Sequence, residues 1–483
     1  MLKNKNLWLW LIWLLLTLAF TTYLVMKINN KAADKSIFLP GETTHGHHQI
    51  ELACGACHSK SFADKEAIQE SCMNCHGKAL KDNDDKHPKS KFTDPRNAER
   101  VAILDARYCV TCHIEHNPEV TLEMGVTMPP DYCHLCHEKI AEERPSHEGM
   151  AFTTCASAGC HNYHDNQALY EDYLIKHLHQ PDILDKQEFP PDLNLDELAP
   201  VLPEYPIKDY PLERLKLVDA NAPLNIEYDA EILYEWFDTT HANSGVNCTA
   251  CHQQTINEKT VWTDTPDHKV CASCHGPEVD GFLAGKHGMR LDSERLKQEL
   301  TAMTPDLARL PMKKDVQHKE LGCNSCHEAH DYNTTTARVE ACLGCHDDEH
   351  SLAYIDSPHH KLWKQELAGE LPEHSGVTCA TCHMPRIEKE FMDGMFYMGI
   401  VQHNQNDTLQ PNEKMLRPVC MDCHGLGFGI DALADEKLIH NNFDGQPGVH
   451  IESMDMAEVR MKEAEEKRRR LREQAKDENS PTP

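Results

Sequence analysis

One short pattern recurs along this chain: two cysteines three positions apart, with a histidine directly after the second. This pattern is the attachment signature of c-type haem, because the two thiols bind the macrocycle and the adjoining imidazole binds the iron. Ten copies have this spacing, and an eleventh copy, with Cys155, Cys160 and His161, is two residues longer. The ten regular copies are Cys54/Cys57/His58, Cys72/Cys75/His76, Cys109/Cys112/His113, Cys133/Cys136/His137, Cys248/Cys251/His252, Cys271/Cys274/His275, Cys323/Cys326/His327, Cys342/Cys345/His346, Cys379/Cys382/His383 and Cys420/Cys423/His424.

These motifs account for every cysteine, since eleven motifs use 22 cysteines and the chain has 22. A disulfide framework has no reason to put a histidine after every second cysteine, and a zinc ribbon uses its motifs in pairs. We therefore expect eleven covalently attached haem c groups, with the histidine of each motif as the proximal iron ligand.

So many cofactors limit the kind of fold. The 483 residues leave about 44 for each macrocycle, and aromatic residues make up only 6% of the chain. Such a chain cannot bury enough apolar surface without haem, so we expect folding and haem loading to be coupled. The predicted fold is mainly α with extensive loops, one N-terminal transmembrane helix and two haem-packed modules.

The formal net charge of −30 argues against a nucleic-acid partner, because there is no basic face to neutralise phosphates. The charge favours cationic redox partners, and solubility through self-repulsion is the alternative explanation.

Residues 7–26 contain no charge and are long enough to cross a membrane as a helix, with Trp8, Trp10 and Tyr23 towards its ends. We predict a retained anchor after a cytoplasmic segment 1–6; a cleaved secretion signal is the alternative. Haem c is attached outside the cytoplasmic membrane. The prediction is therefore a single-pass protein of the inner membrane with its haem modules in the periplasm.

The motif density divides the rest of the chain. After a linker at 27–44 we expect a pentahaem module at 45–180, a Pro-rich acidic segment at 181–240 and a hexahaem module at 241–450. The segment at 181–240 is either an interdomain linker or an arm packed on a surface. A charged tail follows at 451–483, whose pairs such as Glu466 and Arg470 predict a solvated helix; docking of its basic run on an acidic partner or lipid is the alternative.

The remaining histidines are numerous: of 33, eleven belong to motifs, which leaves two for each haem. A second axial histidine gives six-coordinate, low-spin iron, and we expect about ten of the eleven irons to have one. Histidines three or four positions after a motif are expected to share its helical face and to point towards a neighbouring haem. The alternative for any one of them is a surface or propionate-bonding role. The candidate distal ligands are His47, His48, His87, His116, His147, His164, His241, His268, His287, His318, His330, His350, His359, His360, His374 and His403.

The region 45–180 resembles class III and related multihaem cytochromes in its haem spacing and in Cys109-Val110-Thr111-Cys112-His113-Ile114-Glu115-His116. Some of those proteins are membrane-tethered and quinol-linked, so the resemblance implies a quinol-linked membrane donor or redox complex.

The C-terminal half resembles the octahaem hydroxylamine-oxidoreductase-like family. That resemblance implies a mostly helical scaffold with closely stacked haems, one of them catalytic. The chain departs from the family in having six motifs in this half and no tyrosine after Tyr397, so the late tyrosine that cross-links the catalytic haem is absent. The matching segments are Ser357 to Trp363, Ser375 to Arg386, His403-Asn404 and Arg417-Pro418-Val419-Cys420.

Two functions follow as hypotheses. The first is a membrane-anchored, eleven-haem electron-transfer cytochrome working between a membrane or quinol-linked donor and a periplasmic or outer-membrane acceptor. The second is a reductase of a nitrogen or sulfur oxyanion with one five-coordinate haem, in which His287, His359, His360 or His403 lines a substrate pocket. A structural haem filament is a third possibility, which a retained anchor disfavours.

Overall fold

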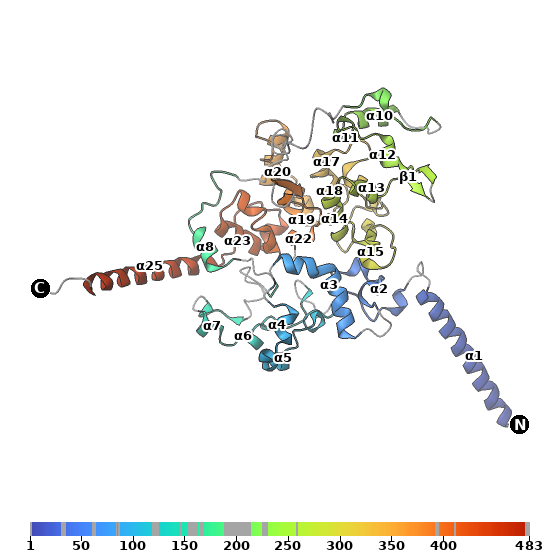
Figure 1. Cartoon of the computed structure of the whole chain (residues 1–483), viewed down its shortest axis with the longest axis horizontal. Coiled ribbons are helices and arrows are strands. Elements are labelled where there is room, and N and C mark those ends of the chain that lie inside the picture. The colour runs from blue at the N-terminus through green and yellow to red at the C-terminus, as the bar shows by residue number, and fades with distance from the viewer. Residues whose placement is uncertain are drawn as a thin grey trace. The chain divides into compact units, whose positions relative to one another are not determined.

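The computed structural model confirms a mainly helical chain with extensive loops (Figure 1). Within the described residues the strands form two antiparallel hairpins. The eleventh motif and much of the predicted linker lie outside the described residues. The structure describes residues 2–29, 35–59, 64–83, 85, 87–117, 125–144, 147–152, 163–164, 169–187, 214–224, 230–256, 259–391, 396–409 and 412–478.

Two compact units can be distinguished: unit 1 comprises residues 1–135 and 290–301, and unit 2 comprises 136–289 and 302–483. The helices of unit 1 are α1 (Leu2–Asn29), α2 (Cys54–Cys57), α3 (Lys65–Asp82), α4 (Lys89–Thr93), α5 (Ala98–Ile103) and α15 (Ser293–Leu296). Helix α6 (His134–His137) lies where the two units divide.

Unit 2 holds most of the described helices and the four strands. They are α7 (Ile140–Glu143), α8 (Glu171–Lys176), α10 (Ala230–Phe237), α11 (Thr240–Asn243), α12 (Cys248–His252), β1 (Gln253–Ile256), β2 (Lys259–Trp262), α13 (His268–Ala272), α14 (Gly276–Ala284), α16 (Asn324–His327), α17 (Thr334–Ala337), α18 (Glu340–Leu343), α19 (Glu349–Ala353), α20 (Pro358–Leu367), α21 (Cys379–His383), β3 (Arg386–Phe391), β4 (Phe396–Val401), α22 (Asn406–Leu409), α23 (Leu426–Ala434), α24 (Glu436–His440) and α25 (Ser453–Glu478).

This division differs from the predicted modules at 45–180 and 241–450, whose boundaries stay predictions. A short segment far along the chain belongs to unit 1, because α15 packs against α2. In addition, the Arg290 guanidinium donates to the backbone carbonyl of Gln49 at 2.6 Å. Haem-rich sequence density therefore does not by itself mark where compact units begin and end.

Helix α1 contains the predicted apolar span, with Asn6–Lys27 long and apolar enough to cross a membrane. None of that span is buried inside the protein. The threonine hydroxyl groups of this helix form hydrogen bonds within it: Thr17, Thr21 and Thr22 donate to backbone carbonyls four residues earlier at 2.8–2.9 Å. This back-bonding meets the requirement that polar groups in hydrocarbon find partners within the helix.

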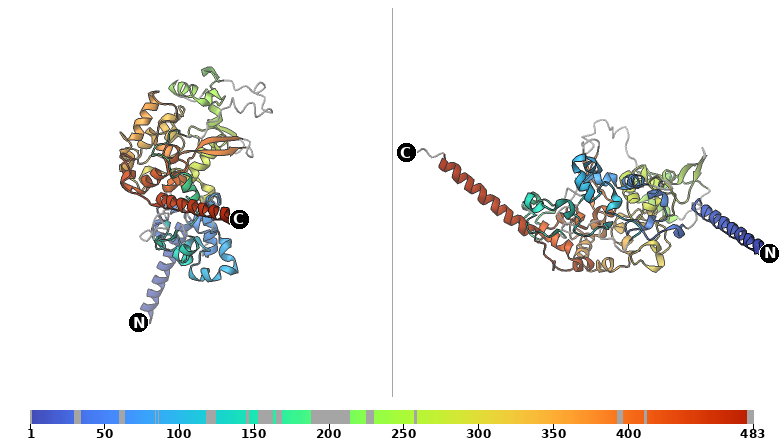
Figure 2. Two further views of the ribbon diagram at one scale, coloured as in Figure 1. Left: turned by 90° about the vertical axis from the view of Figure 1, so that its left-hand side faces the viewer. Right: turned by 90° about the horizontal axis from the view of Figure 1, so that it is seen from below.

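Apolar side chains of unit 2 gather in a small core that joins segments distant in the chain. Leu174 of α8, Leu426 of α23 and Ala457 of α25 are buried there together with Leu416. The start of α25 is thus part of a core. The rest of α25 continues as a single uninterrupted helix (Figure 2). Its residues 462–474 are exposed, as the charge pattern predicts.

Candidate haem sites

The motifs share a local backbone geometry of one helical turn. The backbone N–H of the histidine donates to the carbonyl of the first cysteine, for example from His58 to Cys54 at 2.8 Å and from His424 to Cys420 at 2.8 Å. At α21 a capping box fixes the turn, because Thr378 and Thr381 each donate a backbone N–H to the other's hydroxyl. One turn therefore presents two thiols and an imidazole together, as attachment of one haem requires.

The second cysteine of a motif is not always well covered. Cys274 is exposed, whereas Cys136 and Cys345 are half-buried. Their backbone supports the predicted turn: Cys136 lies within α6, and the N–H groups of Cys274 and Cys345 each donate to the carbonyl of their motif's first cysteine at 3.1 Å. Haem attachment at these cysteines, as at the other motifs, stays a prediction.

Every motif histidine in the second half of the chain has another histidine opposite it in unit 2. The distances between ring centroids fall in a narrow range, from 5.8 to 6.4 Å. The pairs are His252 with His330 at 5.8 Å, His275 with His241 at 6.0 Å, His327 with His403 at 6.3 Å, His346 with His287 at 6.3 Å, His383 with His350 at 6.0 Å and His424 with His359 at 6.4 Å.

These separations fit an iron atom between two axial imidazoles. A metal–nitrogen bond to histidine is about 2 Å long, so the centre of each ring lies about 3 Å from the metal and the two centres about 6 Å apart. Ordinary stacking contact would bring flat rings closer. The residues present therefore fit haem c with two histidine ligands at the six motifs from Cys248 to His424.

Hydrogen bonds at Nδ1 leave the Nε2 nitrogen of several of these imidazoles available to bind a metal. His350 and His403 donate Nδ1–H to the backbone carbonyls of Ile439 and Val401, at 2.5 and 2.9 Å. Among the motif histidines, His252 and His424 do the same to other carbonyls, at 2.7 and 2.8 Å. With the proton fixed on Nδ1, the lone pair of Nε2 is free for a metal.

Burial favours the neutral form of these rings. It lowers the pKa of His287, His359 and His383 to about 4, and a neighbouring histidine lowers each further in the same direction. The three imidazoles are therefore neutral at physiological pH, which is the form that ligates metals.

The ring planes of the six pairs range from nearly parallel to nearly perpendicular. His252 and His330 are nearly parallel, with an interplanar angle of 15°. The pairs His275 with His241 and His383 with His350 are close to perpendicular, at 86° each.

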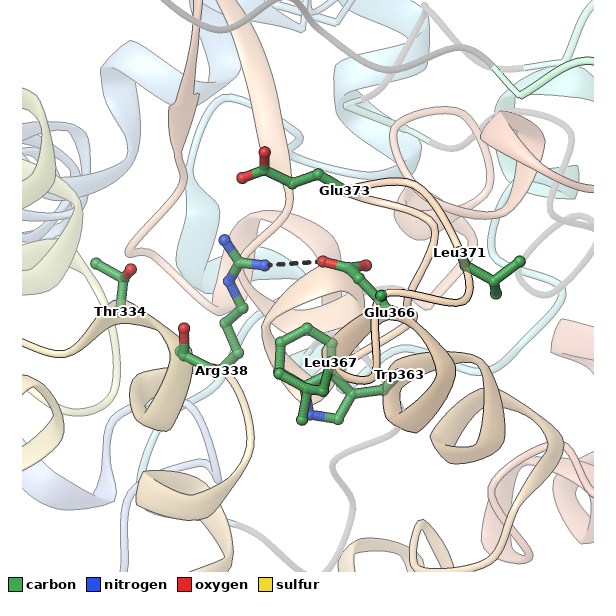
Figure 3. Close-up of a pocket in the computed structure, with 9 residues that line it drawn as sticks. Thr334, Arg338, Trp363, Glu366, Leu367, Leu371 and Glu373 are labelled. Carbon is green, nitrogen blue, oxygen red and sulfur yellow. Dashed lines mark ion pairs between the residues drawn. The ribbon is translucent and has the colours of Figure 1, made fainter.

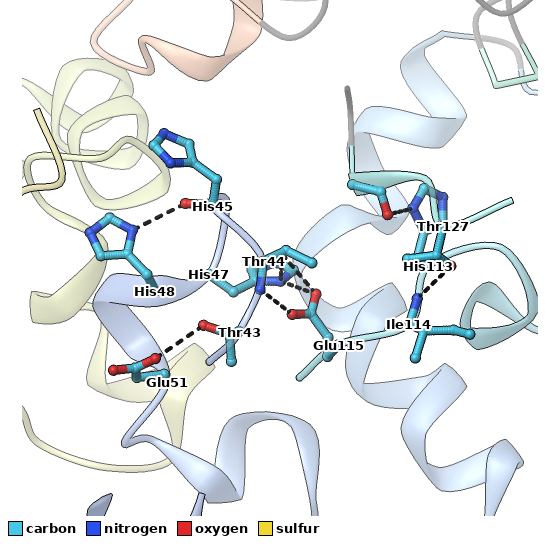
Figure 4. Close-up of polar contacts among 11 residues, drawn as sticks. Thr43, Thr44, His45, His47, His48, Glu51, His113, Ile114, Glu115 and Thr127 are labelled. Atoms are coloured by element: carbon cyan, nitrogen blue, oxygen red, sulfur yellow. Dashed lines mark hydrogen bonds and ion pairs between the residues drawn. The ribbon is translucent and has the colours of Figure 1, made fainter. Parts of the chain in front are cut away.

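In unit 1 the same separation occurs between His76 and His47, whose ring centroids are 5.8 Å apart. Here the second histidine has a charged partner: His47 donates Nδ1–H to the carboxylate of Glu115 at 2.6 Å (Figure 4). Burial disfavours ionisation of Glu115, but hydrogen bonds from His47 and Thr44 outweigh it and lower the pKa to about 2. Glu115 is therefore a carboxylate at neutral pH.

Two further histidines of unit 1 are held by backbone carbonyls. His113 donates Nδ1–H to Gly125 at 3.0 Å, and His116 donates to Gly41 at 2.9 Å. Position 41 must be glycine for this approach, since a Cβ there would lie 2.6 Å from the backbone oxygen of His116.

The other candidate distal histidines lie in varied surroundings. His147 is half-buried, and His268 begins α13. The contacts of the rest are His48 with the His45 carbonyl at 3.1 Å, His87 with the Phe92 ring at 6.4 Å, His164 with Tyr163 at 4.9 Å, His318 with Asp306 at 3.8 Å, His360 with Tyr354 at 4.9 Å, and His374 with Arg386 at 3.4 Å.

The helical geometry expected for histidines that closely follow a motif is wrong in two cases. His116 and His330 have φ of 62° and 70°, and Glu328 before His330 has φ of 53°. A left-handed backbone interrupts any shared helical face. A sharp turn, rather than a helix, directs His330 to the ring of a different motif, that of His252.

The cysteine thiols of successive motifs in unit 2 interact in chain order. The Cys271 thiol raises the pKa of Cys323, and the Cys379 thiol raises the pKa of Cys342. Burial raises the pKa of Cys251, Cys326 and Cys382, and a cysteine of the next motif, Cys271, Cys342 and Cys423 respectively, raises each further. Cysteines of the six motifs from Cys248 to His424 therefore lie near those of the next motif in chain order.

A cavity of about 450 Å³ lies between α17 and α20 (Figure 3). Arg338 reaches the carboxylate of Glu366 across it at 3.6 Å and lies over the ring of Trp363. The described lining contains no histidine, so this cavity is not the substrate pocket in which the reductase hypothesis places His287, His359, His360 or His403.

Two residues of interest in the structure are not among the site residues predicted from the sequence. Glu115 lies between His113 and His116, and an acid between two candidate ligands is the signal that points to it. His177, which follows α8, has a buried Nε2 without a hydrogen-bond partner among the described residues. Nothing in its sequence surroundings distinguishes it, because no motif is near.

Comparison with known proteins agrees with this chemistry. The family model described as cytochrome c3 matches residues 46–138. Cytochrome c-552 of Haemophilus influenzae (strain 86-028NP) is 22% identical over 194 residues, covering 32% of this chain and 32% of that protein. The chain thus matches about a third of that relative's length. These matches support a multihaem c-type cytochrome with covalently bound haem c; the two finer family resemblances stay predictions.

Proposed function

We propose that the chain is a membrane-anchored, eleven-haem cytochrome that carries electrons between a membrane or quinol-linked donor and a periplasmic or outer-membrane acceptor. The observation that carries the proposal is the set of six histidine pairs in unit 2, with ring centroids 5.8 to 6.4 Å apart. Haem c, when bound, supplies a one-electron ferric/ferrous couple.

The residues around each site have three tasks in this proposal. The thiols would attach the macrocycle, the paired imidazoles would hold the iron, and the hydrogen bonds from Nδ1–H would fix the ring orientations. Motif cysteines from Cys251 to Cys423 lie near those of the next motif, which supports successive sites being adjacent. Helix α1 supports attachment to the inner membrane, with a cleaved secretion signal as the alternative.

The reductase hypothesis needs one iron with an open axial position. His287, His359 and His403 each lie opposite a motif histidine, which disfavours a pocket role for them. His360 accepts a hydrogen bond at Nδ1 from the backbone of Asp356, at 2.9 Å. These observations favour the electron-transfer function over the reductase.

Low-temperature electron paramagnetic resonance of the oxidised full-length protein, integrated against a chemical haem count, tests the proposal. We expect eleven haems per chain and low-spin signals from at least ten of them, with no high-spin signal that responds to nitrite, hydroxylamine or sulfite. A high-spin signal from about one haem in eleven, shifting on addition of nitrite, hydroxylamine or sulfite, would favour the reductase. A redox titration with a single potential and no coupling between haems would also count against an electron-transfer chain.

A further inference from the structure

The carboxylate of Glu115 is held in a specific position. It accepts the Thr44 backbone N–H at 2.8 Å and the Thr44 hydroxyl at 3.0 Å, in addition to His47 Nδ1–H at 2.6 Å. Thr44 is buried, with 4% of its surface exposed, so it provides a fixed support. Figure 4 shows Glu115 pointing at Thr44 and His47 across the gap between two loops.

The partner of Nδ1 controls how strongly an imidazole donates to a metal. A carboxylate draws the Nδ1 proton towards itself and increases negative charge on the ring, more than a neutral carbonyl does. Greater ligand basicity stabilises ferric iron relative to ferrous iron, which lowers the reduction potential.

We infer that Glu115 is a positioning residue that makes the haem held by His76 and His47 a low-potential site within unit 1. The inference rests on the proposed ligation of that haem. No atom is transferred in the reaction: one electron converts ferric to ferrous iron, and the Nδ1 proton stays in the hydrogen bond between His47 and Glu115.

Unit 1 provides a matched control. Glu51 is another carboxylate beside the same loop, but it accepts from the Thr43 hydroxyl, at 3.5 Å, instead of from a histidine (Figure 4). Glu115→Gln and Glu51→Gln therefore remove the same charge from one neighbourhood, and only the first also changes the partner of a candidate ligand.

The test is a potentiometric titration of the full-length protein, followed by visible and paramagnetic resonance spectra. In Glu115→Gln we expect one component to move to higher potential with the haem count unchanged. That component should be absent from a Cys72→Ser/Cys75→Ser variant, which lacks the attachment thiols. Identical titrations for Glu115→Gln and Glu51→Gln would overturn the inference.

A second variant predicts a shift of opposite sign. Thr44→Val keeps the shape of the side chain but removes one donor that competes for the carboxylate. His47 should then bond Glu115 more strongly, and the same component should move to lower potential. If Glu115→Gln fails to assemble, this variant decides, and an unchanged or higher potential overturns the inference.

The spin state separates this inference from the proposed function. If His47→Ala leaves every haem low-spin, the ligation itself is wrong and both proposals fail at this site. If His47→Ala produces one high-spin haem but Glu115→Gln shifts no potential, the ligation stands and only the role of Glu115 is overturned.

Discussion

One second histidine of unit 1 is held differently from two second histidines of unit 2. In unit 2, His350 and His403 donate Nδ1–H to neutral backbone carbonyls. In unit 1, His47 donates to the carboxylate of Glu115. The spacing of the rings is alike in both units, so the arrangement of axial histidines does not distinguish these sites. The sites differ in the group that accepts the Nδ1–H of the second histidine, and a charged acceptor beside a ligand changes the stability of the oxidised iron.

One motif histidine of unit 2 is intermediate. His346 lies 3.4 Å from the carboxylate of Asp348, a longer contact than that between His47 and Glu115. The same carboxylate accepts the backbone N–H and the hydroxyl of Ser351, at 3.0 and 2.8 Å. Much of its hydrogen-bonding capacity is therefore directed away from the ring, and we expect a weaker effect on that site.

The largest expected effect is the loss of a whole cofactor. Replacing Cys155 and Cys160 by serine should reduce the haem count from eleven to ten, because no thioether bond can form at the long motif. The mass of the intact holoprotein measures this directly. A wild-type mass that already corresponds to ten haems would show that the long motif carries none.

The next effect is a change of spin state, and neighbouring histidines supply the controls in both units. His359→Ala should open one iron and convert one haem to high spin, whereas His360→Ala should not, because His360 contacts Tyr354 instead of a motif histidine. His47→Ala and His48→Ala form the corresponding pair in unit 1. Ferric resonance spectra measure all four. High-spin iron in His360→Ala but not in His359→Ala would show that the pairing at His424 is misassigned.

A smaller effect concerns the shape of the low-spin signals. Parallel imidazole planes give rhombic ferric spectra, and perpendicular planes give strongly anisotropic ones. His330→Ala, which removes one ring of the 15° pair, should therefore delete a rhombic signal. His241→Ala, from an 86° pair, should delete an anisotropic signal. Loss of the same signal type in both variants would contradict the different ring orientations of these two pairs.

The smallest expected effect lies at the start of α25. His450 bridges Asp431 and Asp455 at 2.9 Å each, and the hydrogen bonds that its ring donates to Asp455 and Asp431 raise its pKa to about 9. The pKa of His450 in the folded protein lies above the unfolded value of about 6.5, so the protonated ring stabilises the fold. This stabilisation is complete below about pH 6.5 and is lost as the pH rises through about 9. Hydrogen exchange of the first amides of α25 should then accelerate at high pH.

A matched substitution tests this assignment. His440 donates Nδ1–H to the backbone carbonyl of Glu436 and bridges no carboxylates. His450→Gln should remove the additional acceleration of exchange between pH 7 and 10, beyond the intrinsic increase, whereas His440→Gln should retain it. Retention in both variants would locate the titrating group elsewhere.

The sequence predicted the chemistry of this chain well, because haem attachment is written in local spacing. Each motif needs only one helical turn to bring two thiols and an imidazole together, and that turn recurs, as in the hydrogen bond from His346 to Cys342 at 2.9 Å. The apolar helix at 7–26 likewise follows from the length of its uncharged run, and a mainly helical fold was also predicted.

Which histidine lies opposite which motif depended on the tertiary structure. His241 precedes its own nearest motif yet lies opposite His275, and His403 lies opposite His327, 76 residues earlier in the chain. The carboxylate at Glu115 and the segment 290–301 likewise reach partners distant in sequence. Attachment is a contact between residues a few positions apart, so spacing determines it; axial pairing and hydrogen bonding to a ligand join separate segments, and only the folded chain brings those together.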